Sequence, residues 1–479
     1  MNKRMVLHTL GYVLGAEAVL LLLPLLVSFL YGEDTIPFLI TIGLLAAACG
    51  SLLCIRLRTK NIYARDGFFI VSASWILVSL FGALPFVLDG AIPSYVDALF
   101  ETVSGFTTTG ASILSDVETV PYGLLFWRSF THWIGGMGVL VFIMAILPMA
   151  NERSMHVMRA EVPGPSVGKL VPRARRTALL LYGIYLTMTV LEVILLVCGG
   201  MPLFDSLVNS FGTAGTGGFA IKNLSIGAYN SAYAEGVITI FMLLFGINFN
   251  LYFLLLMREF RQILKSEELW VYLGTSVTAM LLIALNILPM YNGFGDAFRH
   301  SSFQVSSVIT TTGFATADFN LWPTFSKIIL FMLMFLGACG GSTGGGIKVS
   351  RLIILVKKLS RDIVRMVHPR SVGPVRLDGK KVDEETVNGV GIFFAAYILM
   401  IAFITLLISL DGFDFETTLS AVVACISNIG PGMGAVGPMG NFADFSVFSK
   451  LLLSLTMLLG RLEIFPLILT LTPILYRKQ

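Results

Sequence analysis

Long apolar runs, separated by shorter polar segments, make up most of this chain. Ten runs approach or exceed the length that a helix needs to cross a hydrocarbon core of about 30 Å. They lie near residues 9–30, 36–55, 68–88, 124–148, 177–199, 234–257, 270–290, 326–340, 389–410 and 446–475. We therefore predict an all-α membrane protein with ten helices. The run at 326–340 is short and leads into a glycine-rich stretch, so this helix is predicted to be broken.

The composition agrees with a membrane location. Charged residues make up 13% of the 479 residues and hydrophobic residues 56%, whereas soluble domains are about 25% charged. A soluble enzyme of this composition would expose large apolar patches to water, which soluble monomers rarely do. The first apolar run is longer than the core of a signal peptide, so we predict that it is retained as a membrane helix.

The distribution of charge predicts the orientation. With both termini in the cytoplasm, all but seven of the 33 Lys and Arg residues lie in cytoplasmic segments, as the positive-inside rule requires. The seven exceptions are Arg128, Lys222, Arg299, Lys327, Lys348, Lys450 and Arg461. The predicted external segments are weakly acidic, which favours cations at the outer face.

A pattern repeats four times after the first two helices. Each long external segment contains a semi-apolar stretch of about 12 residues, too short to span a bilayer, that ends in a cluster of small residues. The anchor glycines of these clusters are Gly110, Gly218, Gly313 and Gly430. Each anchor has one helix before it and one after it, so the unit is helix, half-helix, glycine turn, helix. Because two crossings return the chain to its starting side, all four parallel units can surround one axis, giving a pseudo-fourfold pore.

This organisation divides the chain into five parts. Two N-terminal helices (1–62) precede pore repeat one (63–165), repeat two (166–266), repeat three with its broken second helix (267–380) and repeat four (381–479). Asp97 and Asp205 each lie 13 residues before their anchor glycine, where we expect them to cap the outer ends of their half-helices.

Glycine turns at membrane depth suit an ion path. Irregular backbone is tolerated there only where it is buried or lines a wet cavity. Glycine permits backbone angles that direct several carbonyls toward an axis, and such carbonyls can replace the water shell of a monovalent cation. A half-helix that ends at the turn also directs its negative dipole end inward.

The motifs as a set resemble a known family. Besides the four turns, they include the segment at 126–138 (FWRSFTHWIGGMG), the loop at 340–348 and the segment at 460–463 (GRLE). From about residue 65 onward the chain resembles the bacterial Trk/Ktr potassium uptake family, and its two extra N-terminal helices resemble the TrkH/TrkG-like pore subunits. The resemblance implies potassium as substrate, no cofactor, and a carbonyl filter. The implied filter residues are Thr108, Thr109, Gly110, Thr216, Gly217, Gly218, Thr311, Thr312, Gly313, Asn428, Ile429 and Gly430.

The resemblance also implies a gate below the filter. The broken helix of repeat three is similar to the family's intramembrane loop, which here would comprise Gly340, Gly341, Gly344, Gly345 and Gly346. Lys348 could bind helix-end carbonyls or acidic partners, or it could reach toward the cytoplasm as an interfacial lysine. Arg461 lies within the last apolar run, where it could oppose cation passage in the pore or form a salt bridge with an acid on another helix.

Partners and location follow from the resemblance as well. It implies a bacterial inner membrane protein that forms a homodimer and binds a nucleotide-binding regulatory subunit of the TrkA type. The basic segments at 153–176 and 351–381 would supply the docking surface, although contact with anionic membrane lipid is an equal explanation. No nucleic-acid partner is expected.

The sequence leaves two other classes of function to compare with a pore. A proton- or sodium-coupled cation symporter remains the alternative, because broken helices also build transporter sites. An intramembrane enzyme is not favoured, since the membrane acids Glu17, Glu192 and Glu463 lie on three different helices. The stretch at 432–437 fits Gly-x-Gly-x-x-Gly, but Pro438 follows it and no strand is predicted before it, so we do not expect a dinucleotide site there.

Overall fold

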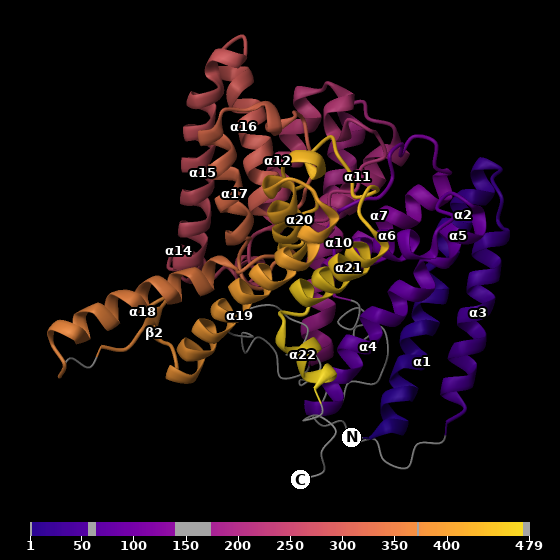
Figure 1. Ribbon diagram of the computed structural model, residues 1–479, viewed down its shortest axis with the longest axis horizontal. Coiled ribbons are helices and arrows are strands. Elements are labelled where there is room, and N and C mark those ends of the chain that lie inside the picture. Colours follow the sequence, from indigo (N-terminus) through magenta and orange to yellow (C-terminus); the bar gives the residue numbers. More distant parts are fainter. Residues whose placement is uncertain (1, 56–63, 139–173, 371–372, 473–479) are drawn as a thin grey trace.

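The computed structural model describes residues 2–55, 64–138, 174–370 and 373–472. The second half of the run at 124–148 and most of the basic segment at 153–176 lie outside these residues. Six described segments are long and apolar enough to cross a membrane, or seven if a bent pair counts as one span. Two strands, β1 (Arg376–Leu377) and β2 (Lys380–Lys381), form an antiparallel pair. The prediction of an all-α, multi-pass membrane protein is confirmed (Figure 1).

An N-terminal hairpin packs against the first unit. α1 (Lys3–Leu20) and α2 (Leu22–Tyr31) form one span, and α3 (Ile36–Leu53) packs against α1. The carboxylate of Glu33 accepts hydrogen bonds from the backbone N–H groups of Tyr122 and Gly123, at 2.6 and 2.9 Å. These two residues begin α7, so the carboxylate satisfies free N–H groups at a helix start and fixes the hairpin to it.

The other helices form four successive groups of similar order. The first contains α4 (Ala64–Gly82), α5 (Leu84–Asp89), α6 (Tyr95–Phe106) and α7 (Tyr122–Gly136). The second contains α10 (Ala174–Cys198), α11 (Leu203–Gly215), α12 (Ala232–Phe245), α13 (Phe249–Leu256) and α14 (Phe260–Leu264). The third contains α15 (Glu267–Ile287), α16 (Phe294–Ile309), α17 (Thr324–Leu336) and α18 (Val349–Val367), and the fourth α19 (Glu384–Ile408), α20 (Phe415–Ser427), α21 (Val447–Arg461) and α22 (Phe465–Leu471). Short 3-10 helices lie at Ser225–Tyr229, Leu288–Met290, Phe319–Leu321, Ser409–Asp411 and Gly434–Val436. Below, α6, α11, α16 and α20 are the half-helices, and α7, α12, α17 and α21 are the following helices.

Two predicted helices are interrupted, so the expectation of ten helices was wrong in these places. The run at 234–257 forms α12 and α13, which meet at an angle of 90°. The side chain of Asn248 caps the start of α13 and so favours a new helix over continuation of the old one. The run at 446–475 stops at the end of α21, because Glu463 and Ile464 have φ angles of +54° and +67°, which a right-handed helix cannot contain.

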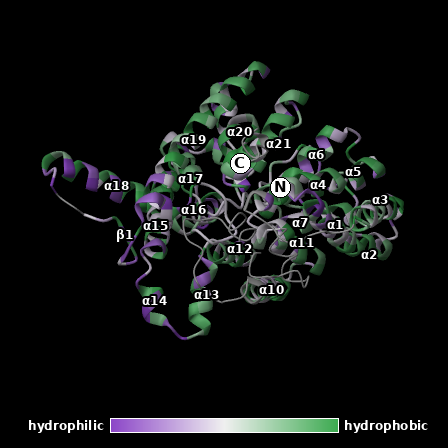
Figure 2. Cartoon of the chain, turned by 90° about the horizontal axis from the view of Figure 1, so that it is seen from below, coloured by the Kyte–Doolittle hydropathy of each residue, from purple (hydrophilic) through white to green (hydrophobic). Residues whose placement is uncertain are grey.

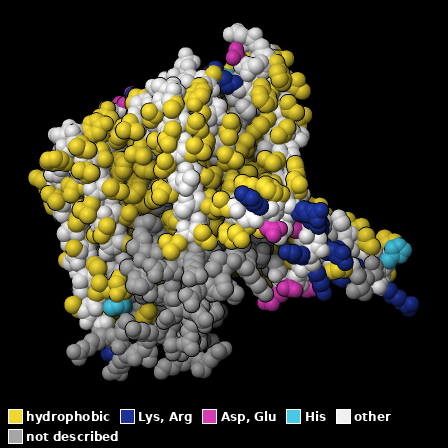
Figure 3. Space-filling view, turned by 180° about the vertical axis from the view of Figure 1, so that it is seen from behind, with side chains coloured by type: hydrophobic (Ala, Val, Ile, Leu, Met, Phe, Trp, Pro, Cys, Tyr) yellow, Lys and Arg dark blue, Asp and Glu magenta, His cyan; other side chains and the backbone are white. Residues whose placement is uncertain are grey.

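Apolar side chains cover much of the described surface on the face seen in Figure 3, while α18 extends away from the bundle (Figure 1). Figure 3 shows hydrophobic side chains over the body of the molecule and Lys and Arg side chains gathered on the projecting part. Seen from below, α18 carries hydrophilic and hydrophobic residues in alternation (Figure 2). A helix with this pattern fits a membrane surface or a protein interface better than the interior of a bilayer.

Each of the seven basic residues outside the predicted cytoplasmic segments has an identified partner. Five form ion pairs: Arg128 with Glu101 (2.6 Å), Lys222 with Glu118 (3.2 Å), Arg299 with Glu235 (2.6 Å), Lys327 with Glu416 (3.1 Å) and Lys450 with Asp97 (2.7 Å). Lys348 donates to the carbonyl of Gly344, and Arg461 to that of Gly136. Their places are therefore set by contacts inside the protein, so they do not argue against the predicted orientation.

The pair between Arg128 and Glu101 generates a stability prediction. Its side chains are only 3% and 0% exposed, and removing one partner of a buried pair typically destabilises a protein by about 3 to 5 kcal/mol. We expect Glu101→Ala to lower the thermal unfolding midpoint in detergent strongly. Lys222→Ala removes an exposed pair and should change stability by about 0 to 1 kcal/mol. Equal shifts in the two variants would contradict this account.

Candidate functional site

The four glycine turns share one backbone geometry. In each turn two residues have positive φ: the anchor glycine and the residue two positions before it. The earlier residues are Thr108, Thr216, Thr311 and Asn428, with φ between +53° and +59°, and the anchor glycines Gly110, Gly218, Gly313 and Gly430 have φ between +75° and +98°. Left-handed backbone is unfavourable for residues with a Cβ atom. Its recurrence at the same position in four turns indicates that the turn requires it.

Hydrogen bonds at the ends of the half-helices explain how this geometry is held. In the first turn the N–H of Thr109 donates to the carbonyl of Ser104 (2.8 Å) and the N–H of Thr108 donates to that of Gly105 (3.0 Å). This pair of bonds is the Schellman arrangement that ends a helix in a left-handed residue. The other three turns make the corresponding two bonds. Within the described chain, none of the twelve carbonyls predicted for the filter accepts a hydrogen bond, so they are available to a cation.

The four turns lie next to one another in a closed ring. A Cβ atom added to an anchor glycine would meet a backbone carbonyl oxygen of the next turn. The distance from the added Cβ atom to the carbonyl oxygen is 1.9 Å for Gly110 and Gly217, and 2.0 Å for Gly218 and Thr312. It is 2.2 Å for Gly313 and Ile429, and 2.7 Å for Gly430 and Thr109. The fourth turn therefore touches the first. At each anchor both the backbone angle and the space exclude a side chain.

Side-chain hydroxyl and amide groups lock the turns. The hydroxyls of Thr107 and Thr109 are 2.8 Å apart in the first turn, and those of Thr310 and Thr312 are 2.8 Å apart in the third. The side-chain amide of Asn428 donates to the hydroxyl of Thr109 at 2.9 Å. This last bond joins the fourth turn to the first, so the sequence difference in turn four serves a specific contact.

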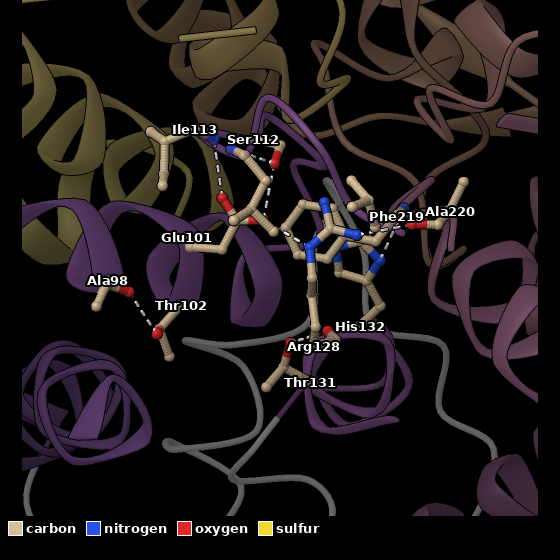
Figure 4. Close-up of polar contacts among 12 residues, drawn as sticks. Ala98, Glu101, Thr102, Ser112, Ile113, Arg128, Thr131, His132, Phe219 and Ala220 are labelled. Carbon is tan, nitrogen blue, oxygen red and sulfur yellow. Dashed lines mark hydrogen bonds and ion pairs between the residues drawn. The ribbon is translucent and has the colours of Figure 1, made fainter. Parts of the chain in front are cut away.

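The first and second units are joined beside the second turn (Figure 4). Arg128 on α7 pairs with Glu101 on α6 and donates to the carbonyl of Ala220 at 2.9 Å. Its guanidinium carbon lies 3.5 Å from the centre of the Phe219 ring, a cation–π contact. The imidazole of His132 stacks on the same Phe219 ring, with 4.2 Å between the ring centres. α7 of the first unit thus holds the residues that follow the second anchor glycine.

The glycine-rich loop between α17 and α18 lies against turns three and four. The N–H of Gly345 donates to the hydroxyl of Thr311 at 2.7 Å. A Cβ atom added to Gly345 would lie 2.2 Å from the carbonyl oxygen of Ser427, and one added to Gly344 would lie 3.0 Å from that of Thr310. The loop therefore approaches the ends of two half-helices closely only because it lacks side chains there.

Two charged residues hold this loop, and one of them was not identified from the sequence. Glu268 on α15 accepts hydrogen bonds from the backbone N–H groups of Gly340 (2.7 Å) and Ser350 (3.1 Å). The only sequence signal for it is an acid near the start of a membrane helix. Lys348 is 2% exposed and donates from Nζ to the carbonyl of Gly344. Lys348 thus contacts a carbonyl of the loop and not the expected helix-end carbonyl, and its burial contradicts the interfacial alternative.

Arg461 connects three elements beneath the ring. Its guanidinium donates to the hydroxyl of Thr108 (3.2 Å) in the first turn, to the carbonyl of Thr343 (2.9 Å) in the loop and to the carbonyl of Gly136 (2.9 Å) at the end of α7. Arg461 is the last residue of α21 rather than the middle of a continuous helix. The break that follows it places the side chain among backbone carbonyls.

A cavity of about 300 Å³ is lined by all four anchor glycines, and neither Arg461 nor the glycine-rich loop is among its lining residues. Arg128 and Lys222 also line it, together with Gly437 from the Gly-x-Gly-x-x-Gly stretch. That stretch therefore belongs to the wall of this cavity. The ring of anchor glycines therefore borders this cavity.

The predicted capping roles of Asp97 and Asp205 are corrected. The N-cap of α6 is Ser94, and Pro202 precedes α11. Asp97 lies in the first turn, where it pairs with Lys450, and Asp205 accepts a hydrogen bond from the hydroxyl of Tyr229 at 2.8 Å. Both carboxylates still lie at the positive end of a half-helix dipole.

An aspartate does cap the fourth half-helix. The carboxylate of Asp414 accepts a hydrogen bond from the backbone N–H of Thr417 at 3.2 Å. Hydrogen bonds from Thr417 lower the pKa of Asp414 below its ordinary value, since they favour the ionised form. This end of α20 therefore carries a stable negative charge.

Comparison with known proteins agrees with these features. The family model described as TrkH, cation transport protein, matches residues 38–475. The Trk system potassium uptake protein TrkH of Halomonas elongata is 36% identical, with 100% of both chains covered. TrkG of Escherichia coli K12, also a Trk system potassium uptake protein, is 34% identical, with 100% of this chain and 99% of the relative covered.

Solved structures agree as well. The crystal structure of the potassium transporter TrkH from Vibrio parahaemolyticus matches with a TM-score of 0.89 and 34% identity, covering 100% of both chains. The family model spans most of the chain, and the relatives match it over nearly their full length. Together these matches assign the chain to a family. This chain belongs to the TrkH family of cation transport proteins, and it is a transporter rather than an enzyme.

Proposed function

We propose that this protein carries potassium into the cell through a membrane pore, with potassium as substrate and no cofactor. The observation that carries the proposal is the closed ring of anchor glycines, because it brings unbonded carbonyls from four turns together. The relatives' names, which state potassium uptake, support the identity of the ion. Conduction is channel-like and follows the electrochemical gradient.

The twelve turn residues form the selectivity filter in this proposal. Backbone carbonyls that are free of hydrogen bonds can replace the hydration shell of a potassium ion. The half-helices α6, α11, α16 and α20 end at the ring, so the negative ends of their dipoles add to the attraction for a cation. The left-handed angles recur in all four turns, which supports equivalent contributions from each turn.

The glycine-rich loop and Arg461 form the gate. The loop contacts the third and fourth turns from Gly344 and Gly345, and Arg461 connects it to the first turn. Glu463, two residues after Arg461, pairs with Arg351 at the start of α18 at 2.5 Å. Movement of α18 would therefore act on the loop and on Arg461 together, and removing the arginine from the pore would open the path.

The orientation and partners are proposed as well. We place the protein in the bacterial inner membrane with both termini in the cytoplasm, on the basis of the basic segments. α18 exposes the apolar side chains of Leu359, Ile363 and Met366, which supports a homodimer contact or burial in lipid. Basic residues of the same segment support docking of a nucleotide-binding subunit of the TrkA type.

Coupled symport is the second candidate. Glu17 and Glu192 are buried acids inside membrane helices, and such residues often mark proton pathways. Radioactive rubidium uptake into liposomes that contain the purified protein separates the two functions. For a channel we expect uptake to follow the potassium gradient and to ignore imposed proton or sodium gradients. Acceleration by an inward proton or sodium gradient would instead establish coupling.

The filter assignment predicts the effect of alanine at the anchor glycines. Gly110→Ala and Gly313→Ala each add a Cβ atom onto a neighbouring carbonyl at a left-handed position. Because coordination requires atoms placed within about 0.5 Å, rubidium uptake should fall at least about tenfold. Gly412→Ala is the matched control, since Gly412 has φ of +79° with nothing near its Cβ position. Normal uptake by both filter variants would reject the filter.

The gate assignment predicts a gain of function. Arg461→Ala removes a positive charge that opposes cation passage, so rubidium flux should rise several-fold. Arg461→Lys keeps the charge and should resemble the unchanged protein more closely. A fall in flux for Arg461→Ala, with normal membrane levels, would show that the residue holds the pore together instead of closing it.

A further inference from the structure

The four units meet at four junctions, and in each a following helix contacts the next unit's half-helix. The contacts run from α7 to α11, α12 to α16, α17 to α20, and α21 back to α6. This is the same cyclic order as the ring of anchor glycines. The junctions therefore surround the ring.

Three of these junctions contain an ion pair at matching positions. The fourth residue of the following helix is charged in each case: Glu235 in α12, Lys327 in α17 and Lys450 in α21. Its partner lies near the start of the next half-helix, 13 or 14 residues before the anchor glycine. The partners are Arg299, Glu416 and Asp97, respectively. The sign of the charge varies, but its position does not.

The pairs are close, and in two of them one of the two side chains is well shielded from water. Arg299 and Glu235 form a bidentate pair with distances of 2.6 and 2.8 Å, and the Glu235 side chain is 2% exposed. Lys450 lies 2.7 Å from Asp97 and its side chain is 8% exposed. Bidentate and shielded pairs fix the relative position of two helices more firmly than exposed pairs do.

The remaining junction uses rings instead of charges. The fourth residue of α7 is Leu125, which is buried. Phe204, 14 residues before Gly218, packs against Tyr122 at the start of α7 with 5.0 Å between ring centres. Tyr31 of the N-terminal hairpin stacks on Tyr122 at 4.3 Å. The start of the following helix is thus joined to the next half-helix at all four junctions, by ion pairs at three of them and by aromatic packing at the fourth.

We propose that the three ion pairs act as a clamp around the outer ends of the half-helices and set the ion selectivity of the ring. They are positioning residues, which reach the ion only through the half-helices. The half-helices α6, α16 and α20 are each tied at the inner end by the turn and at the outer end by an ion pair of the clamp. Loss of one pair lets that half-helix tilt and shifts its carbonyls, and selectivity between ions of similar size depends on such placement. The inference rests on the proposed filter.

Charge exchange at the junction between α21 and α6 tests the clamp. We measure rubidium and sodium uptake separately in liposomes with the full chain. Lys450→Asp and Asp97→Lys should each lower the rubidium-to-sodium ratio about tenfold, a shift of about 1.4 kcal/mol in relative barrier. The double exchange should restore the ratio to within about twofold, because it restores the pair. Gly412→Ala is the control here too, because nothing lies near its Cβ position, and it should leave the ratio unchanged.

Neutral variants cover the case in which charge exchange prevents folding. Lys450→Gln, Asp97→Asn and their double variant should lower the ratio to the same extent, since each abolishes the same pair. An unchanged ratio in the single variants, or additive losses in the double variant, would overturn the clamp. If Gly110→Ala and Gly313→Ala block uptake while the junction variants keep their ratio, only the clamp fails. If the glycine variants transport normally, the proposed filter itself fails.

Discussion

A left-handed turn at the end of a membrane half-helix is the constraint on which this structure depends. The helix must stop within the membrane, and two backbone bonds at each stop satisfy N–H groups of the turn. The carbonyls that follow are left without donors in the described chain. Only a setting that supplies a cation or water makes such carbonyls acceptable at that depth. Four such stops in one ring are therefore the defining feature of the molecule.

The surrounding structure keeps this ring narrow and fixed. Neighbouring turns approach so closely that the anchor positions accept only glycine. Asn428 joins the last turn to the first, Arg128 crosses from the first unit to the second, and Arg461 connects the first turn to the loop below. Most basic residues inside the membrane region thus hold backbone carbonyls or acids of another unit. In these contacts their charge holds neighbouring parts of the protein together.

The sequence predicted the repeated parts well and the irregular parts poorly. Small-residue clusters in phase with apolar runs predicted four similar turns, because helix length and glycine are local signals. The 90° bend before α13 and the break at Glu463 were not predicted, since only two polar residues interrupt the apolar run at each place: Asn248 and Asn250, and Arg461 and Glu463. Glu268 and the pair of Asp97 with Lys450 were missed or misassigned because both depend on contacts across more than 70 residues. The prediction was therefore limited by contacts between residues far apart in the chain and by short polar interruptions of apolar runs.

The most direct test locates the ion itself. Crystals of the protein grown in thallium or rubidium salts would give anomalous scattering from any bound ion. The account predicts peaks on the axis of the ring, within coordination distance of the carbonyls of Thr109, Gly217, Thr312 and Ile429. Peaks confined to sites away from the four turns, with the ring empty at saturating salt, would contradict it.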